Sequence, residues 1–191
     1  LTMMLAGPFA TMLLGDQGAT IIKIEPVKGG DMTRYLGKGQ NGMPFGGYFQ
    51  SINRNKLSIA LDLKTGDGKE VLRRLVRDAD VLVENYRVGV MDRLGLSYES
   101  LAKINPKLVY ATVRGFGDPR TGKSPYAEWP AFDVIAQAMG GIMGITGPDA
   151  NTPLKIGPGV GDIVPAMLMT IGILSAVRHA ESTGEGQFVD V

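Results

Sequence analysis

Short runs of β-branched residues alternate along this chain with stretches in which apolar residues recur every three or four positions. The first pattern is typical of strands and the second of helices. The β-branched runs predict strands at 19–25, 57–61, 81–84, 108–113 and 187–191. Helices are predicted at 8–16, from 64 onward, around 91, at 98–104 and after 162. Strands that alternate with helices indicate an α/β fold built on a parallel sheet.

Two further segments stand out in this pattern. Residues 27–47 contain seven glycines and predict a long loop, and loops of that length are usually functional or disordered. The apolar run at 163–177 falls short of the roughly 20 residues that a membrane-spanning helix needs. We therefore expect a buried core helix there and no membrane segment. A shorter apolar segment begins at Phe132.

The segment just before that apolar run holds the first candidate for chemistry. Residues 157–162 read Gly-Pro-Gly-Val-Gly-Asp. Glycines let the backbone approach a ligand closely, and the N–H groups and dipole at a helix start favour an ionised carboxylate. The pattern thus suits Asp162 as a nucleophile, but an ordinary N-cap aspartate has the same pattern. These residues by themselves leave both interpretations open.

Composition and charge exclude several function classes. The net charge of the 191 residues is +1 and no basic block occurs, which argues against nucleic-acid binding. The chain has no cysteine and one histidine, so disulfides, thiolate chemistry and the usual transition-metal sites are excluded. His179 is predicted to be structural, near the end of the last helix. Without cysteines, the cytosol is the expected compartment.

Polar and cationic residues follow the predicted strands. They include Glu25, residues 84–87 and residues 114–117. An open parallel sheet binds its ligand beyond the carboxyl ends of its strands. We therefore expect an anionic, partly aromatic ligand at this edge, such as a nucleotide-bearing cofactor.

Residues 117–124 match the phosphate-binding P-loop pattern G-x-x-x-x-G-K-S. The P-loop mechanism requires a helix that starts at the lysine, here Lys123. Pro125 and Pro130 disfavour such a helix, because proline removes a backbone N–H and clashes inside the second turn. A surface loop is the favoured interpretation, and a P-loop NTPase is kept as an alternative.

Several ordered segments together resemble the class III coenzyme A transferases, the group that includes formyl-CoA transferase. Examples are Gly-Ala-Thr-Ile-Ile-Lys-Ile-Glu-Pro at 18–26, Gly-Asp-Met-Thr-Arg at 30–34 and Val-Glu-Asn-Tyr at 83–86. Further matching segments are 5–8, 53–64, 80–82, 92–95, 132–138, 161–162 and 184–187. The resemblance implies a Rossmann-like parallel sheet flanked by helices, within a larger fold of two interlocked chains. It also implies that this chain is an amino-terminal part of the large domain, without its first strand and its carboxy-terminal half.

The resemblance assigns the catalytic role to Asp162. In this family the aspartate attacks an acyl-CoA thioester, gives a mixed anhydride, and then becomes an aspartyl-CoA thioester when the CoA thiolate returns. An acceptor carboxylate finally takes over the CoA. The implied partners are acyl-CoA and carboxylate substrates and a second copy of the chain. From composition and segment length we expect no metal, nucleic acid or membrane.

The resemblance also implies a set of CoA contacts. Lys64 and Arg93 suit the CoA phosphates, and Tyr86 suits the adenine or the pantetheine. Two positions depart from formyl-CoA transferase, which has Gln where Leu5 stands and Arg where Pro26 stands, so formate and oxalate are not the expected substrates. The full implied set is Leu5, Ala6, Leu61, Asp62, Leu63, Lys64, Asn85, Tyr86, Arg87, Arg93, Pro130, Ala131, Phe132 and Asp133.

Two other functions compete with CoA transfer. The related α-methylacyl-CoA racemases use a His/Asp acid–base pair, and their histidine falls at Phe132, which cannot transfer a proton. That departure favours a transferase. A non-catalytic CoA-binding module would not need the carboxylate of Asp162.

Overall fold

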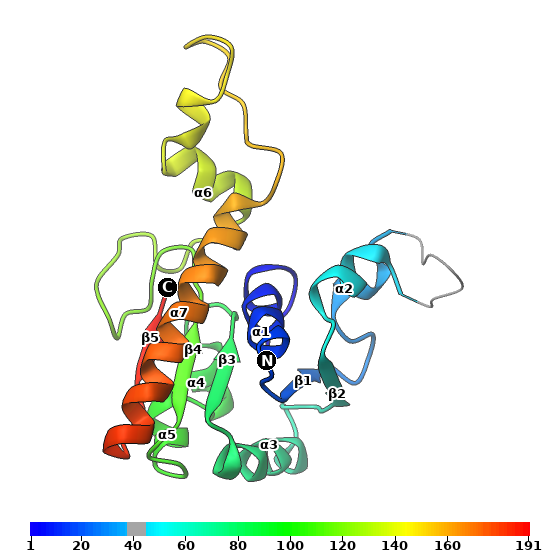
Figure 1. Cartoon of the computed structure of the whole chain (residues 1–191), viewed down its shortest axis with the longest axis vertical. Coiled ribbons are helices and arrows are strands. Elements are labelled where there is room, and N and C mark those ends of the chain that lie inside the picture. Colours follow the sequence, from blue (N-terminus) through cyan, green and yellow to red (C-terminus); the bar gives the residue numbers. More distant parts are fainter. Residues whose placement is uncertain (38–44) are drawn as a thin grey trace.

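The structure, a computed structural model, describes residues 1–37 and 45–191 (Figure 1). It contains two small parallel sheets flanked by helices, where the sequence predicts one sheet. In the first, β1 (Ile21–Glu25) pairs with β2 (Lys56–Ala60). In the second, β4 (Val109–Thr112) lies between β3 (Val81–Glu84) and β5 (Phe188–Asp190). All pairs are parallel, so the predicted α/β class is confirmed.

Helices make the crossovers that parallel strands require. The connection from β3 to β4 contains α4 (Val90–Leu94) and α5 (Tyr98–Ala102). Between the two sheets, α3 (Gly66–Asp78) connects β2 to β3. The crossover from β4 to β5 includes α6 (Asp133–Met139), the 3₁₀ helix η2 (Ile142–Ile145) and α7 (Val160–Thr183). A further helix, α1 (Ala6–Asp16), precedes β1.

The second sheet is buried on both faces. Leu82 and Tyr110 pack on one side with residues of α3 and α5, such as Leu72 and Leu101. The neighbouring strand residues, including Ala111, pack on the other side with α1 and α7. This alternation follows from the two-residue period of a strand, and helices on both faces are typical of parallel sheets.

The structure contains short helices that the sequence pattern does not predict. The 3₁₀ helix η1 (Met32–Tyr35) and the helix α2 (Gly47–Ile52) lie in and beside the predicted loop at 27–47, of which residues 38–44 fall outside the described residues. The side chain of Asp31 caps η1 by accepting from the backbone N–H of Thr33. A single capped turn has too few residues to show a periodic pattern, and the glycines around it predict a loop.

The long helix α7 is only partly a core helix. Its inner face is buried against α1 and β4 and includes Met169 and Ile173. Its outer face exposes a stripe of large apolar side chains, so the prediction of a buried core helix is wrong for this face. The stripe comprises Val164, Met167, Leu168, Ile171 and Leu174. Among the described residues, α7 is the one helix long and apolar enough, by length and composition, to cross a membrane.

An open groove of about 710 Å³ lies between the two sheets. Its lining includes residues 21–24 of β1, residues 81–83 of β3, and side chains of α3 and α7. Within the described residues, β1 and β3 have no strand partner on the sides that face this groove. The two sheets therefore do not join.

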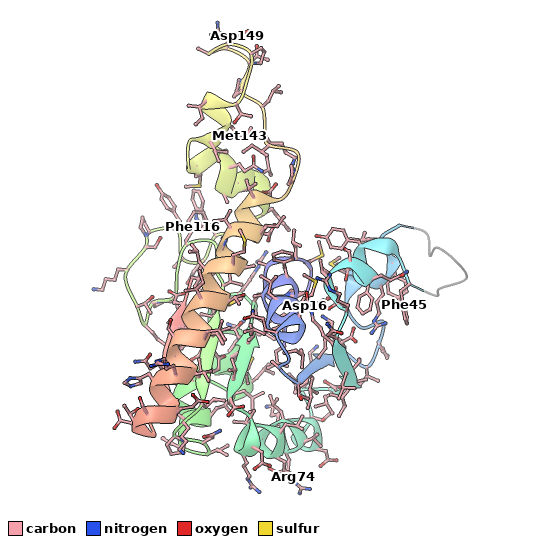
Figure 2. The ribbon with its side chains drawn as sticks, viewed as in Figure 1. Asp16, Phe45, Arg74, Phe116, Met143 and Asp149 are labelled. Carbon is pink, nitrogen blue, oxygen red and sulfur yellow. The ribbon has the colours of Figure 1, made fainter. Side chains whose placement is uncertain are left out.

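The segment between β4 and α7 extends away from the sheets. Met143 and Asp149 mark it in Figure 2, at the amino-terminal end of α7. Arg74 marks the outer surface of α3, at the opposite end of the molecule in this view. The extended segment brings α6 to the start of α7, and this is where Asp162 lies.

Candidate active site

Asp162 lies inside the first turn of α7. The helix begins at Val160, its N-cap is Gly159, and no side chain caps it. The backbone N–H of Asp162 donates to the carbonyl of Gly159 at 3.1 Å. The N-cap interpretation of Asp162 is therefore wrong, and its half-buried carboxylate is left free for another role.

The surroundings of Asp162 raise its pKa above the ordinary value of 3.8. Burial is the main cause, and the nearby carboxylate of Asp133 adds to it. No hydrogen bond from the rest of the described chain opposes these two effects. The sequence predicts the opposite, a helix start that favours the ionised form. A carboxylate with a raised pKa is a stronger base, and it is poorly solvated, which suits nucleophilic attack once it is ionised.

The three glycines before Asp162 have different surroundings. A Cβ on Gly157 would meet nothing within 4 Å, whereas one on Gly159 would lie 3.1 Å from the Leu5 side chain. A Cβ on Gly161 would lie 2.8 Å from the Cβ of Ala136 on α6. No contact within the described residues requires Gly157 to lack a side chain, whereas Gly161 is required by the contact between α6 and α7. Close approach of these glycines to a ligand stays a prediction.

Substitution of Gly161 should test this distinction. Gly161→Ala is expected to push α6 away from α7, because a core contact that is overpacked shifts its backbone, and to lower kcat/KM by about 10²-fold through misplacement of Asp162. The matched control is Gly157→Ala, which enters open space and should retain activity. Steady-state kinetics of the two full-length variants measure the effect. A larger loss for Gly157→Ala would show instead that ligand approach sets the glycine requirement.

A pocket of about 700 Å³ lies beyond the carboxyl end of β1. It brings together much of the CoA-contact set that the resemblance implies, including Lys64, Tyr86 and Arg93. The sequence analysis missed Lys28, which adds a third cation to the lining. The complete lining is Ile24, Glu25, Pro26, Val27, Lys28, Leu61, Asp62, Leu63, Lys64, Tyr86, Val90, Arg93 and Leu94.

The backbone of Tyr86 is held by a buried ion pair. Its N–H donates to Glu84 at 2.7 Å, and its carbonyl accepts from Arg114 at 2.8 Å. Arg114 and Glu84 in turn form an ion pair at 2.5 Å, with side chains that are 7% and 0% exposed. Burial raises the pKa of Glu84 even though the Arg114 charge lowers it. This pair fixes the turn that carries Tyr86 into the pocket.

The other implied contacts lie outside that pocket. The amide of Asn85 accepts from the backbone N–H of Met3 at 2.9 Å and donates to its carbonyl at 2.8 Å. Ala6 is buried and Arg87 is exposed. Leu5 approaches Gly159 beside Asp162. The segment from Met3 to Leu5 thus connects the pocket edge to the candidate nucleophile.

The last implied contacts, residues 130–133, lie at the start of α6. Pro130 and Phe132 are exposed. Ala131 packs closely on Gly115: a Cβ added to Gly115 would lie 1.9 Å from the Cβ of Ala131. The carboxylate of Asp133 accepts from the backbone N–H of Gly161 at 2.9 Å. Asp133 therefore belongs to the surroundings of Asp162 in this structure, and not to the pocket.

Tyr48 and Glu25 are two further ionisable groups near the site, and nothing in the sequence pattern pointed to Tyr48. Burial and the charge of Asp162 raise the pKa of Tyr48, which places this α2 residue close to the candidate nucleophile. At the pocket, burial alone would raise the pKa of Glu25, but hydrogen bonds from Arg34 and Ser58 bring it down to about 2. Glu25 is consequently an ionised, fully engaged group at the pocket wall.

The P-loop alternative is not supported by the backbone. Lys123 lies in an irregular segment, and turns follow it where a P-loop requires a helix. Asp118, inside the motif, is buried and paired with Arg114 at 3.1 Å. Residues 117–124 form a loop, as the prolines predict. Within residues 1–37 and 45–191, no group of three or more His, Cys, Asp or Glu side chains is placed to hold a metal ion.

Comparison with known proteins identifies the family. The profile of CoA-transferase family III matches residues 1–191. The chain belongs to CoA-transferase family III. A succinyl-CoA:mesaconate CoA-transferase of Haloarcula hispanica is 50% identical over the whole chain, and an acetyl-CoA:oxalate CoA-transferase of Acetobacter aceti is 47% identical over the whole chain. The resemblance stated from the sequence is confirmed.

Solved structures support the same family. A CaiB/BaiF family protein from Brucella suis superimposes with a TM-score of 0.91 at 42% identity, covering 99% of this chain and 50% of that protein. The chain likewise spans 48% of the length of each of the two relatives above. The Haloarcula hispanica and Acetobacter aceti proteins are named as CoA-transferases, so the racemase alternative is not favoured.

Proposed function

We propose that the full-length protein transfers CoA from an acyl-CoA donor to a carboxylic acid acceptor, with Asp162 as the covalent nucleophile. The observation that carries this proposal is the uncapped, half-buried carboxylate of Asp162, whose pKa is raised. It lies at the end of a segment that begins beside a cation-lined pocket. Membership of family III supports the reaction class.

The proposed reaction splits one exchange into successive acyl-transfer steps through covalent intermediates on Asp162. Asp162 attacks the thioester, the carbon–sulfur bond breaks, and an aspartyl anhydride and the CoA thiolate result. The thiolate attacks the aspartyl carbonyl and releases the donor acid, leaving an aspartyl-CoA thioester. The acceptor carboxylate attacks that carbonyl and releases the thiolate, which then takes the acceptor acyl group and frees Asp162.

The pocket suits the nucleotide end of CoA. Lys28, Lys64 and Arg93 can donate to its phosphates, and Tyr86 offers an aromatic face. The pantetheine would then pass the segment 3–5, where Leu5 and Gly159 are close to each other. This path puts the thioester beside Asp162 and the phosphates in the pocket.

We propose a dicarboxylic acid as the acceptor class. Two of the matched relatives are named for mesaconate and oxalate, and a third, from Agrobacterium fabrum and 43% identical, is named as a succinate–glutarate CoA-transferase. Leu5 provides an apolar contact next to Asp162. A panel of dicarboxylate acceptors and acyl-CoA donors, tested with the complete enzyme, identifies the pair.

We further propose a homodimer, as the resemblance implies, in which the exposed apolar stripe of α7 is covered. The stripe runs along one face of a helix of 24 residues, and a continuous apolar face of that kind is typical of an interface. The groove between β1 and β3 has the parallel edges that the implied additional strand needs. A structure of the full-length protein would show whether a second copy covers the α7 stripe and whether a strand fills the groove between β1 and β3.

Chemical trapping tests the proposed nucleophile. When the full-length enzyme is incubated with an acyl-CoA and hydroxylamine, it should lose activity and carry a hydroxamate on Asp162, because hydroxylamine intercepts aspartyl anhydrides and thioesters. Mass spectrometry of the digested protein locates the modification. The controls omit the acyl-CoA or the hydroxylamine. Modification at another residue, or inactivation without a modified Asp162, would refute the assignment.

A further inference from the structure

One buried side chain of α6 is polar. Gln137 is 3% exposed, and it is the residue that this helix buries. Its amide oxygen accepts from the backbone N–H of Ile156 at 2.7 Å. Its amide nitrogen donates to both carboxylate oxygens of Asp133 at 2.9 Å. Core packing does not explain a buried amide, whereas these specific hydrogen bonds do.

The hydrogen bonds of Gln137 lead to the turn that precedes the nucleophile. Asp133 Oδ1, which Gln137 contacts, also accepts from the backbone N–H of Gly161. Asp133 Oδ2 lies 3.6 Å from the ammonium of Lys155. Gln137 thus joins both ends of the segment 156–161, one end directly and the other through Asp133.

We propose that Gln137 is a positioning residue for Asp162, acting through Asp133 and the turn at 156–161. The inference rests on the proposed role of Asp162 as the nucleophile. Asp162 follows Gly161 directly, so the N–H that Asp133 holds fixes the backbone one residue before the reacting carboxylate. The amide side chain orients Asp133, because it presents its donor to Asp133 while its acceptor is occupied by Ile156.

The hydrogen bonds define the polarity that each position requires. Asp133→Asn would place an amide donor against the amide nitrogen of Gln137, or lose the acceptor for Gly161. Gln137→Glu would place two carboxylates together. The double variant Asp133→Asn/Gln137→Glu keeps the three links to the turn with the 133–137 donor reversed: the Asn oxygen accepts from Gly161, the Asn nitrogen donates to the new carboxylate, and that carboxylate accepts from Ile156. The ion pair between Lys155 and position 133 is lost.

A pH profile separates positioning from mere stability. The charged or titratable groups around Asp162 are Asp133 on α6, Lys155 in the preceding loop and Tyr48 on α2. The negative charge of Asp133 is one reason that the pKa of Asp162 is raised. Moving this charge from 133 to 137 should therefore shift the acid limb of kcat/KM to lower pH, since Asp162 reacts as the carboxylate.

The experiment uses the full-length enzyme. Gln137→Leu should lower kcat by about 10²-fold, with a much smaller change in the KM for acyl-CoA, and should slow hydroxylamine trapping at Asp162 equally. Each single variant, Asp133→Asn and Gln137→Glu, should lose activity. The double variant should recover most of the kcat and show the shifted acid limb. Recovery in the double variant keeps the test decisive even if a single variant folds poorly.

The matched control is Asn105→Ala. The Asn105 amide donates to the carbonyls of Val76 and Ala79 and so braces a turn after α3. Its loss should lower the melting temperature but leave kcat unchanged. Unchanged kcat in Gln137→Leu, or a double variant no better than either single variant, would overturn the proposal. If wild-type enzyme carries no adduct on Asp162, the proposed function fails instead, so the two failures are distinguishable.

Discussion

Replacement of Asp162 by Asn or Ala should lower the kcat of the full-length enzyme by a factor on the order of 10⁴ or more, the scale of loss when a covalent nucleophile is removed. Asn is nearly isosteric, and the Asp162 carboxylate makes no hydrogen bond within the described residues that the substitution would break. Folding should therefore be unaffected, and the KM for acyl-CoA should change little. CoA release and transfer assays measure the loss.

A second first-turn aspartate provides the control. Asp67 lies in the first turn of α3 and is exposed. Asp67→Asn should retain the wild-type kcat, since helix–dipole effects at an exposed site are small. A surviving transferase activity in Asp162→Ala that exceeds a hundredth of the wild-type value would show that another group forms the covalent bond, or that none does.

Loss of the buried pair at Tyr86 should have the largest effect on stability. Arg114→Leu leaves the carboxylate of Glu84 buried without its ion-pair partner, which typically costs about 3–5 kcal/mol. The carbonyl of Tyr86 also loses its donor. We expect a lower free energy of unfolding in urea and a raised KM for acyl-CoA, because the turn that carries Tyr86 loosens.

The loss of stability in Arg114→Leu should depend on pH in a defined direction. Burial raises the pKa of Glu84, and loss of the Arg114 charge would raise it further. The folded variant would therefore take up a proton more readily than the unfolded chain, so the destabilisation should shrink as the pH falls. The control is Arg74→Leu, whose ion pair with Glu70 is 70% and 43% exposed and should contribute less than about 1 kcal/mol. Equal effects of the two substitutions would contradict the role of the buried pair.

The sequence pattern predicted the strands better than the short helices. β1, β3 and β4 lie within their predicted runs, because short runs rich in β-branched and apolar residues are typical of strands. The helix α3 was predicted from its apolar face, and Leu72 and Val76 do pack in the core. By contrast, η1 and α2 span four and six residues. Their formation depends on caps and on tertiary contacts, which leave no period in the sequence.

The pocket was predicted residue by residue only through the family resemblance. Lys64, Tyr86 and Arg93, which the resemblance names as CoA contacts, do line one pocket, and their contact with CoA stays a prediction. The structure pairs the carboxylate of Asp133 with the N–H of Gly161, beside Asp162, and the implied contact of Asp133 with CoA stays a prediction. The residue that holds Asp133, Gln137, was not singled out, because one glutamine in an apolar helical segment has no distinctive spacing.

The sequence by itself determined the fold class, the family and the identity of the candidate nucleophile, because these depend on local periodicity and on ordered motifs. Only the tertiary structure decided which groups surround that nucleophile. Asp133 and Gly161 are 28 residues apart in the chain, and Glu84 and Arg114 are 30 apart. Such contacts form when distant segments pack together, and burial then sets the pKa of the carboxylates. Neither the contacts nor the burial is encoded in any short stretch of the sequence.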